Sequence, residues 1–213
     1  MNRNSQGNSL PTELRTERLI LRSADTNIDA DNAKINYIRS TRHDLEPRAA
    51  NYLCYKQRVH APRQELCTLS PAPTSIYWLA SLQSASGNND QDDDLANLVC
   101  IITMSFRPEM PYPDMGYATA AAHAGHGYAS EAGRAVLHYW RDLVGVREIF
   151  IGCDMDNKPS QRCAERIGFA KAGGFLFETG NPPDVQRKPS VAYVLPGMTW
   201  KEGWIVKALE PED

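Results

Sequence analysis

The order of apolar and polar positions along the chain predicts alternating strands and helices. Short segments rich in branched and aromatic residues are typical of strands, and longer segments with apolar residues at every third or fourth position are typical of helices. The predicted strands cover residues 16–22, 75–83, 98–106, 114–122, 147–154, 170–178 and 190–195. The predicted helices cover residues 29–40, 128–144 and 157–168. The strands at 75–83 and 98–106 are expected to pair, because they are consecutive and a polar loop joins them.

The segment 128–144 carries the clearest helical pattern. Its apolar residues recur at the spacing of one helix face, which predicts that this face lies in the core; they are Ala132, Ala135, Val136, Tyr139, Trp140 and Leu143. The next helix begins with Asn157, a residue type that caps helix N-termini, has Pro159 in its first turn and ends at Gly168.

Other parts of the chain carry weaker signals. Residues 1–11 are polar and predicted to be a disordered tail, so a single domain is expected over residues 12–213. Residues 41–74 mix prolines with apolar residues and predict short helices and loops in no definite order. Three consecutive aspartates in the segment 84–97 could form a metal site or a docking patch. They lack the glycine and glutamate of a calcium loop, so a solvated loop between two strands is predicted.

Charge and hydropathy exclude several classes of function. The net charge is −3, and the 23 lysines and arginines are scattered along the chain, so no nucleic-acid partner is expected. The N-terminus is polar, and no segment has the ~20 consecutive apolar residues that span a bilayer. No membrane association is therefore expected, and the expected location is cytoplasmic, with the nucleus also open.

The five cysteines limit the possible chemistry further. They are Cys54, Cys67, Cys100, Cys153 and Cys163, which are odd in number and form no C-x-x-C pair. Neither a disulfide framework nor a zinc site is predicted from this pattern. The cysteines are expected to be buried free thiols.

The residues with the clearest chemistry begin with the strand 114–122. Its last residues, from Ala120 to Ala122, are small and leave the backbone accessible, although they would equally suit a strand packed under a helix. The turn that follows contains Gly125 and Gly127 and leads directly into a helix. Glycines permit close approach of a ligand, and a helix N-terminus offers unpaired backbone N–H groups. This arrangement predicts an anion site.

The turn does not match the common nucleotide motifs. No Gly-Lys-Ser/Thr follows, as it would in a Walker A loop, and Ser130 stands where the dinucleotide fingerprint has its third glycine. The glycines alone therefore leave a nucleotide, a dinucleotide and coenzyme A (CoA) open as ligands.

Three groups of residues carry a resemblance to a known family. They are Thr-Glu-Arg-Leu-Ile-Leu-Arg at 16–22, Gly-Tyr at 116–117 with Gly-His-Gly-Tyr-Ala-Ser-Glu-Ala at 125–132, and Asn-x-x-Ser-x-Arg at 157–162 with Gly-Phe at 168–169. In this order and spacing they resemble the GNAT superfamily of acyl-CoA-dependent N-acyltransferases, and within it the RimJ and RimL ribosomal-protein acetyltransferases. The resemblance covers about residues 14–195. It implies the α/β GNAT fold, in which helices flank a central mixed, mostly antiparallel twisted sheet.

The resemblance also implies an acetyl-CoA site without a metal. The CoA diphosphate would bind the backbone N–H groups of the turn and the first helical residues, which are Gly125, His126, Gly127, Tyr128 and Ala129. The pantetheine arm would pair with the main chain from Ala120 to Ala122. The thioester would lie where the strand 114–122 splays from the strand 147–154.

Asn157 and Ser160 match family positions that lie near the cofactor or its sulfur, and helix capping is their other interpretation. Two positions depart from the family pattern. Ala122 stands where many members carry Gln or Arg, which removes a side-chain contact but keeps the backbone cradle. Ala164 stands where many relatives carry a tyrosine that acts as general acid, a tyrosine that several members of the RimJ and RimL branch also lack.

Amine acetylation needs a proton acceptor for the amine and a proton donor for the leaving thiolate. His123 is the candidate base, because it stands where the strand meets the turn. Asp114, Glu109 and a water relay are rivals, and His123 and His126 could equally be turn residues with no proton to move. Ser160 is the candidate donor to the thiolate.

The predicted function is transfer of an acetyl group from acetyl-CoA to an amine by direct attack in a ternary complex. The acceptor would be a small molecule or a protein or peptide N-terminus, and the enzyme a monomer or homodimer. Residues 23–74 and the loop 179–189 would shape the acceptor site. The alternative is a GNAT-fold protein that binds acyl-CoA without catalysis or uses the cleft for other chemistry.

Overall fold

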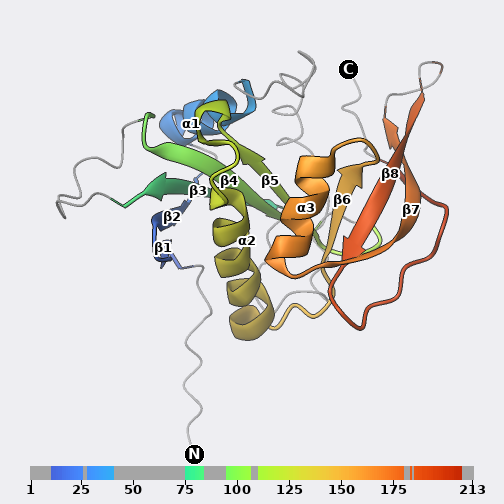
Figure 1. The fold of residues 1–213 in the computed structure, drawn as a ribbon. Helices are drawn as coiled ribbons and strands as arrows, with labels where there is room; N and C mark the ends of the chain where they lie inside the picture. The colour runs from blue at the N-terminus through green and yellow to red at the C-terminus, as the bar shows by residue number, and fades with distance from the viewer. Residues whose placement is uncertain are drawn as a thin grey trace, which may run out of the picture.

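The computed structural model describes residues 11–25, 28–40, 75–83, 95–106, 110–179, 183 and 185–207. In this part of the chain, nine strands form one sheet in the order β1-β2-β3-β4-β5-β6-β8-β7-β9 (Figure 1). The strands are β1 (Glu13–Arg15), β2 (Leu19–Ser23), β3 (Ser75–Leu82), β4 (Leu98–Ser105), β5 (Asp114–Thr119), β6 (Phe150–Asp154), β7 (Ala170–Thr179), β8 (Gln186–Val194) and β9 (Trp204–Lys207). Neighbouring strands are antiparallel except for β5–β6 and β7–β9. The predicted mixed, mostly antiparallel sheet is confirmed, as is the pairing of β3 with β4.

Helices cover both faces of this sheet (Figure 1). On one face, α2 (Tyr128–His138) and α3 (Lys158–Ile167) bury their apolar sides in the largest hydrophobic cluster. On the other face, α1 (Asp29–Ser40) packs Ile35 and Ile38 against side chains of β3, β4 and β5. The three predicted helical segments therefore correspond to three helices that face the sheet.

The long predicted helix continues past α2, but its last part is not α-helical. Residues Tyr139–Val144 form a π-helical segment that ends at Gly145, which has a left-handed φ of 87°. A wider π turn rotates the following residues away from the face that an α-helix would give them. The prediction that Leu143 lies in the core is therefore wrong: Leu143 is 64% exposed, whereas Trp140 is fully buried.

The strand β5 ends at Thr119 instead of Ala122. The Ala120 N–H still bonds the Val99 carbonyl oxygen at 2.9 Å, but Ala121–His123 form a 3₁₀ turn. The small side chains from Ala120 to Ala122 thus lie on a turn that leads into the glycine loop. The strand prediction is too long here because short alanine runs carry no turn signal.

Three other strand boundaries differ from the predictions. The predicted strand 16–22 covers the turn of a β1–β2 hairpin and most of β2. In that turn the Thr16 N–H bonds the Leu19 carbonyl oxygen at 2.9 Å. Residues 186–189 were predicted as part of the loop 179–189 because they are polar. The structure places them at the start of β8, in an exposed part of the β7–β8 ribbon. β6 begins at Phe150, later than predicted, and β9 was not predicted.

The two C-terminal tryptophans pack, as predicted. The Trp200 ring lies 5.2 Å from the Trp204 ring and 5.3 Å from the Phe150 ring, next to a cluster that includes Phe175. These side chains cover the α1 face of the sheet beside β6–β9. The predictions for residues 1–10, 41–74 and 84–94 and for Glu109 lie outside the described residues.

Candidate active site

The sheet is nearly divided between β5 and β6. These parallel strands share a single pair, Asp114 with Phe150, at the start of each strand. Beyond that pair, β5 continues to bond β4 and β6 continues to bond β8, so the two strands diverge toward their C-terminal ends. At a rise of about 3.3 Å per residue, the opening follows β5 for about 17 Å. Among the described residues, no strand pairs with this side of β5 beyond Asp114, so its backbone could bind an extended ligand.

Three polar side chains meet in this opening, one from each element around it. Tyr117 comes from β5, Cys153 from β6 and Ser160 from the first turn of α3. The Tyr117 hydroxyl donates to the Ser160 carbonyl oxygen at 2.6 Å and accepts from the Ser160 hydroxyl at 3.1 Å. The Cys153 Sγ lies 3.3 Å from the Ser160 Oγ. Because Ser160 Oγ uses its proton toward Tyr117, it can accept the thiol proton of Cys153.

The cluster is protonated at neutral pH. Burial raises the pKa of the Tyr117 phenol, and the neighbouring Cys153 and Cys163 thiols raise it further. Burial likewise raises the pKa of the Cys153 thiol, against the hydrogen bonds to Ser160 and Tyr117, which lower it. The opening therefore presents a neutral phenol, hydroxyl and thiol, which are proton donors and not nucleophilic anions.

Capping of α3 holds Ser160 in this place. The Asn157 Oδ1 accepts a hydrogen bond from the Ser160 N–H at 3.0 Å, and Pro159 occupies the first turn. The predicted cap is thus confirmed. It directs the first turn of α3 toward the opening, so that capping and a role for Ser160 in the opening are compatible.

The glycine loop lies at the wide end of the opening, beyond the end of β5. Gly125 and Gly127 both have a φ of 81°, a left-handed conformation that suits glycine. Gly127 is the N-cap of α2, where no side chain caps the helix, and the backbone from Ala124 to His126 is exposed. Successive N–H groups of such a loop and of the helix N-terminus form a concave site for an anion.

Comparison with known proteins decides the family. A family model described as an acetyltransferase (GNAT) domain matches residues 18–170. The chain belongs to the GNAT acetyltransferase family. The resemblance noted in the sequence is confirmed at this level, whereas its narrower assignment to the RimJ and RimL branch stays a prediction.

Solved structures share the GNAT fold. The ribosomal-protein-S5-alanine acetyltransferase from Vibrio fischeri is 16% identical, with a TM-score of 0.56 over 90% of this chain and 100% of that one. The microcin C7 self-immunity acetyltransferase MccE is 14% identical, with a TM-score of 0.54 over 87% and 96%. A variant of the spermidine N-acetyltransferase SpeG from Vibrio cholerae is 12% identical, with a TM-score of 0.52 over 84% and 94%. A search of curated proteins found no match. At these identities the similarity shows the fold alone.

Of the three predicted catalytic residues of this GNAT domain, two lie along the opening, and His123 lies against the segment before β4, on the other side of β5. Asp114 lies at its closed end, where β5 pairs with β6. Ser160 lies beside the middle of β5, against Tyr117. His123 lies past the end of β5, where its Nε2 is 3.1 Å from the Ala96 carbonyl oxygen. A carbonyl oxygen only accepts, so Nε2 donates and Nδ1 is the ring nitrogen that could take a proton.

His126 is an exposed loop residue. Its ring stacks on Tyr128, with the ring centroids 5.6 Å apart and the planes at 10°, and its Nδ1 lies 3.0 Å from the Ala124 carbonyl oxygen. The His123 ring also contacts Tyr128, edge-on, at 6.2 Å. The Tyr128 ring thus contacts both histidines, one in the glycine loop and one before it.

Sequence reasoning missed Tyr117. The residue belongs to the Gly116-Tyr117 motif that helped to identify the family, but it lies 43 positions from Ser160 in the chain. A strand position alone does not reveal which helix the side chain will meet. The signal was a polar aromatic residue on a strand expected to border the opening, next to a second strand that carries Cys153.

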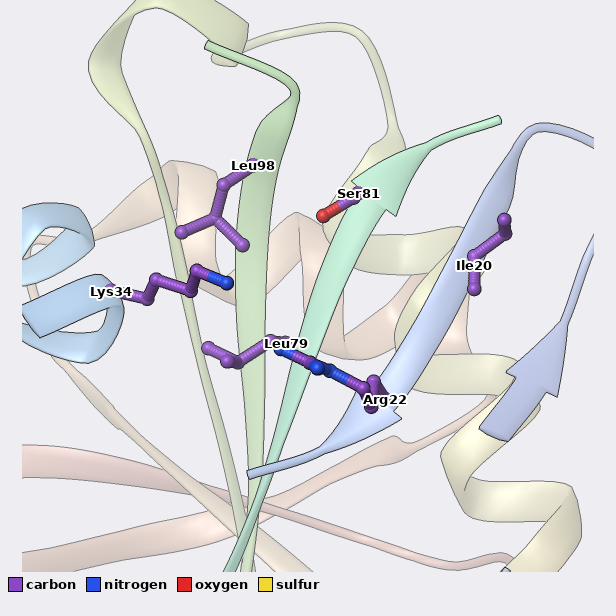
Figure 2. Close-up of a pocket in the computed structure, with 6 residues that line it drawn as sticks. All are labelled: Ile20, Arg22, Lys34, Leu79, Ser81 and Leu98. Atoms are coloured by element: carbon purple, nitrogen blue, oxygen red, sulfur yellow. The ribbon is translucent and has the colours of Figure 1, made fainter. Parts of the chain in front are cut away.

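A separate hollow lies on the α1 face of the sheet (Figure 2). Its lining consists of Ile20, Arg22, Lys34, Leu79, Ser81 and Leu98. In Figure 2 the Lys34 side chain points from α1 toward the strands. The Arg22 guanidinium lies 3.4 Å from the Asp31 carboxylate. None of the lining residues belongs to β5, β6 or α3, so this hollow is distinct from the opening.

The described part of the chain shows neither a metal cluster nor a membrane helix. It contains no group of three or more His, Cys, Asp and Glu residues that could hold a metal ion. No helix within it is long and apolar enough to cross a membrane. Cys100, Cys153 and Cys163 are free; the first two are buried and Cys163 is half-buried. Cys54 and Cys67 lie outside the described residues.

Proposed function

We propose that this protein is an N-acetyltransferase that transfers the acetyl group of acetyl-CoA to an amine by direct attack in a ternary complex. The observation that carries the proposal is the β5–β6 opening, which starts at a glycine loop suited to an anion and contains proton donors halfway along β5. Family membership supports acetyl transfer. The related fold of MccE has been solved with acetyl-CoA and AMP, which supports acetyl-CoA as co-substrate.

In this proposal the CoA diphosphate binds N–H groups from Gly125 to Ala129, including those of His126, Gly127 and Tyr128. The pantetheine arm runs along the backbone from Ala122 and Ala120 into the opening, beside Asn157. The thioester then lies near Tyr117 and Ser160. An extended thioester arm fits because, in the part of the chain that the structure describes, no strand pairs with this side of β5 past Asp114.

The proposed chemistry joins the amine nitrogen to the thioester carbonyl carbon. The C–N bond forms, the C–S bond breaks, CoA leaves as a thiolate and the amine loses a proton. The Tyr117 hydroxyl turns its proton from the Ser160 carbonyl oxygen to the thiolate, and the Ser160 hydroxyl stabilises the phenolate through the hydrogen bond that it already donates. Cys153 takes no covalent part, because a thiol whose pKa is raised by burial is a poor nucleophile.

The amine proton needs an acceptor on the opposite side of the reaction. His123 is the proposed base, acting through Nδ1 directly or through water, and Asp114 at the closed end of the opening is its rival. Replacing His123 with Ala tests this role through thiol-release kinetics. An unchanged rate and pH profile would remove His123 as the base.

The acceptor is proposed to be a small amine or a peptide N-terminus. One fold relative is named as a ribosomal-protein-S5-alanine acetyltransferase, and another as a spermidine N-acetyltransferase. Measuring CoA release from acetyl-CoA with polyamines, amino acids, aminoglycoside antibiotics and peptides should give turnover with one of these classes. Thermal shift with acetyl-CoA, CoA and NAD accompanies the screen. Lack of stabilisation by both CoA species would contradict the proposal.

A binding protein without catalysis is the second candidate. The observation that favours it is Ala164, which is completely buried and places no proton donor at the family's usual tyrosine position. This candidate predicts stabilisation by CoA but no acetylated product from any amine. The catalytic proposal predicts product whose rate of formation falls when Tyr117 loses its hydroxyl.

A further inference from the structure

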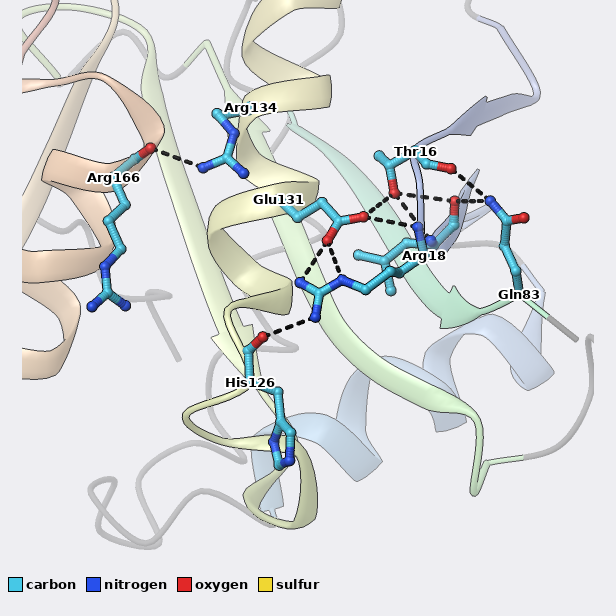
Figure 3. Close-up of polar contacts among 8 residues, drawn as sticks. Thr16, Arg18, Gln83, His126, Glu131, Arg134 and Arg166 are labelled. Atoms are coloured by element: carbon cyan, nitrogen blue, oxygen red, sulfur yellow. Dashed lines mark hydrogen bonds and ion pairs between the residues drawn. The ribbon is translucent and has the colours of Figure 1, made fainter. Parts of the chain in front are cut away.

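The glycine loop is attached to a distant part of the chain by one arginine. Arg18, in the turn between β1 and β2, reaches the first turn of α2 (Figure 3). Its Nε donates to the Glu131 Oε2 at 2.7 Å, and its Nη2 lies 2.6 Å from the same oxygen. The other carboxylate oxygen, Oε1, accepts from the Arg18 backbone N–H at 3.0 Å and from the Thr16 hydroxyl at 2.5 Å. Both oxygens of the Glu131 carboxylate therefore have donors, and all of these donors belong to the turn between β1 and β2.

The same guanidinium also contacts the loop itself. Its Nη1 donates to the His126 carbonyl oxygen at 3.2 Å, and its central carbon lies 4.6 Å from the centre of the Tyr128 ring. A side-chain carbon at Gly127 would lie 3.7 Å from Nη2. Arg18 thus contacts His126 and Tyr128, the residues on either side of Gly127, which restrains the position of this backbone.

These contacts lie on the carbonyl side of the loop. When successive N–H groups converge on an anion, the carbonyl groups of the same residues point away from it. A guanidinium bonded to the His126 carbonyl oxygen therefore supports the loop from behind and leaves the N–H groups free for a ligand. Arg18 is a positioning residue in this arrangement, not a ligand of the anion.

Glu131 explains why a cation is needed at this place. Its side chain is only 12% exposed and lies in the first turn of α2, close to where an anion would bind. Burial raises its pKa, but the hydrogen bonds from Thr16 and Arg18 outweigh burial, so the net pKa is lowered and the carboxylate stays ionised. Without Arg18, this charge would repel a bound diphosphate.

We propose that Arg18 and Glu131 form a clamp that positions the glycine loop for the diphosphate of CoA and cancels the negative charge beside it. The inference rests on the proposed function, since it assigns the loop to CoA. Loss of the clamp should weaken ligands that carry the diphosphate. It should leave unaffected a thioester ligand that lacks the diphosphate and occupies only the opening.

The test compares acetyl-CoA with S-acetylpantetheine, which has the same thioester arm but no diphosphate. Arg18→Ala is expected to raise the Kd for CoA, measured by calorimetry, and the KM for acetyl-CoA about tenfold, as for loss of one charged hydrogen bond. The KM for S-acetylpantetheine should change less than about twofold. Arg134→Ala is the matched control, because Arg134 lies on the same helix and donates to the Arg166 carbonyl oxygen at 3.0 Å, away from the loop.

Two further variants separate positioning from simple stability. Arg18→Lys keeps the charge but not the forked contacts, so an intermediate loss of CoA affinity is expected. The double variant Arg18→Glu with Glu131→Arg restores an ion pair. Its side chain at position 18 is a carboxylate, which cannot donate a hydrogen bond to the His126 carbonyl oxygen. It should regain thermal stability and not CoA affinity.

Each outcome has a definite meaning. Equal losses for acetyl-CoA and S-acetylpantetheine, or unchanged CoA affinity in Arg18→Ala, would overturn the clamp and leave the proposed function intact. Failure of the wild-type protein to bind CoA would overturn the proposed function and the clamp together.

Discussion

The wide end and the middle of the β5–β6 opening are built in different ways. The wide end is formed by backbone: two glycines with positive φ, a helix N-terminus and an ion pair behind them. The middle is formed by side chains, which are a phenol, a hydroxyl and a thiol that stay protonated. Backbone N–H groups and fixed charges suit the permanent charge of a diphosphate. Neutral donors suit a charge that develops only when a thiolate leaves.

This contrast implies that binding and turnover can be impaired separately. Changes at the glycine loop should act on affinity for CoA, whereas changes around Tyr117 should act on kcat. The following variants test that separation.

Tyr117→Phe is expected to have the largest effect. Removing the hydroxyl removes the proposed donor to the thiolate, so kcat should fall about 100-fold, a typical value for a general acid, with CoA affinity within about twofold. Stopped-flow thiol release and calorimetry measure the two quantities. Tyr193→Phe is the control, because it also removes a phenol hydroxyl from a buried tyrosine, but one that donates to Glu165 at 3.3 Å instead of to Ser160. A fall in CoA affinity equal to the fall in kcat would contradict the separation.

Gly127→Ala is expected to act at the other end. A side chain at a φ of 81° strains the backbone by about 1–2 kcal/mol and shifts the loop. CoA affinity should fall about tenfold, while kcat at saturating acetyl-CoA stays near the wild-type value. Gly145→Ala provides the matched control, since it has a φ of 87° and open space around it but lies at the far end of the helical segment. It should lose similar stability without losing CoA affinity, and equal loss of affinity in both variants would argue against a loop-specific role.

Glu131→Gln is expected to change the pH dependence of stability. The carboxylate has a lowered pKa in the folded protein, so its stabilising effect is present above the unfolded value near 4.5 and is lost as pH falls through the folded value. The free energy of unfolding of the wild type should exceed that of the variant by about 1 kcal/mol at pH 7. The difference should shrink below pH 4.5. Urea unfolding at several pH values measures it, and a constant difference would mean that the charge of Glu131 does not matter.

Cys153→Ala is expected to have the smallest effect on activity. Direct attack needs no acetylated cysteine, so kcat should stay within about threefold of wild type, despite a loss of stability of about 1–2 kcal/mol from the cavity. Mass spectrometry of the wild type with acetyl-CoA provides the check. Complete loss of activity together with acetylated Cys153 would indicate a covalent intermediate.

The sequence predicted the features that depend on neighbouring residues. The turn at Gly125 and Gly127, the Asn157 cap and the apolar face of α2 follow from local preferences. Leu143 was misplaced because the hydrogen bonds of a π-helical turn join residues five apart instead of four, a shift of one residue that the apolar pattern does not show. The polar start of β8 was missed because an exposed ribbon has no apolar side.

The contacts that complete the site could not be predicted in the same way. Tyr117 meets Ser160 across 43 positions, and Arg18 meets Glu131 across 113. Such pairs arise only when the sheet brings distant segments together, and no local pattern specifies them. The family motifs contained these residues, but the motifs alone did not assign them roles.

The central claim is that one acyl-CoA molecule binds along the opening, from the glycine loop at its wide end to Tyr117 and Ser160 in its middle. A crystal structure with acetyl-CoA tests it most directly. The diphosphate should lie within hydrogen-bond distance of the N–H groups from Gly125 to Ala129, with the thioester sulfur next to the Tyr117 hydroxyl and β5 still paired to β6 only at Asp114. Acetyl-CoA bound elsewhere, or with its sulfur outside the β5–β6 opening, would contradict the claim.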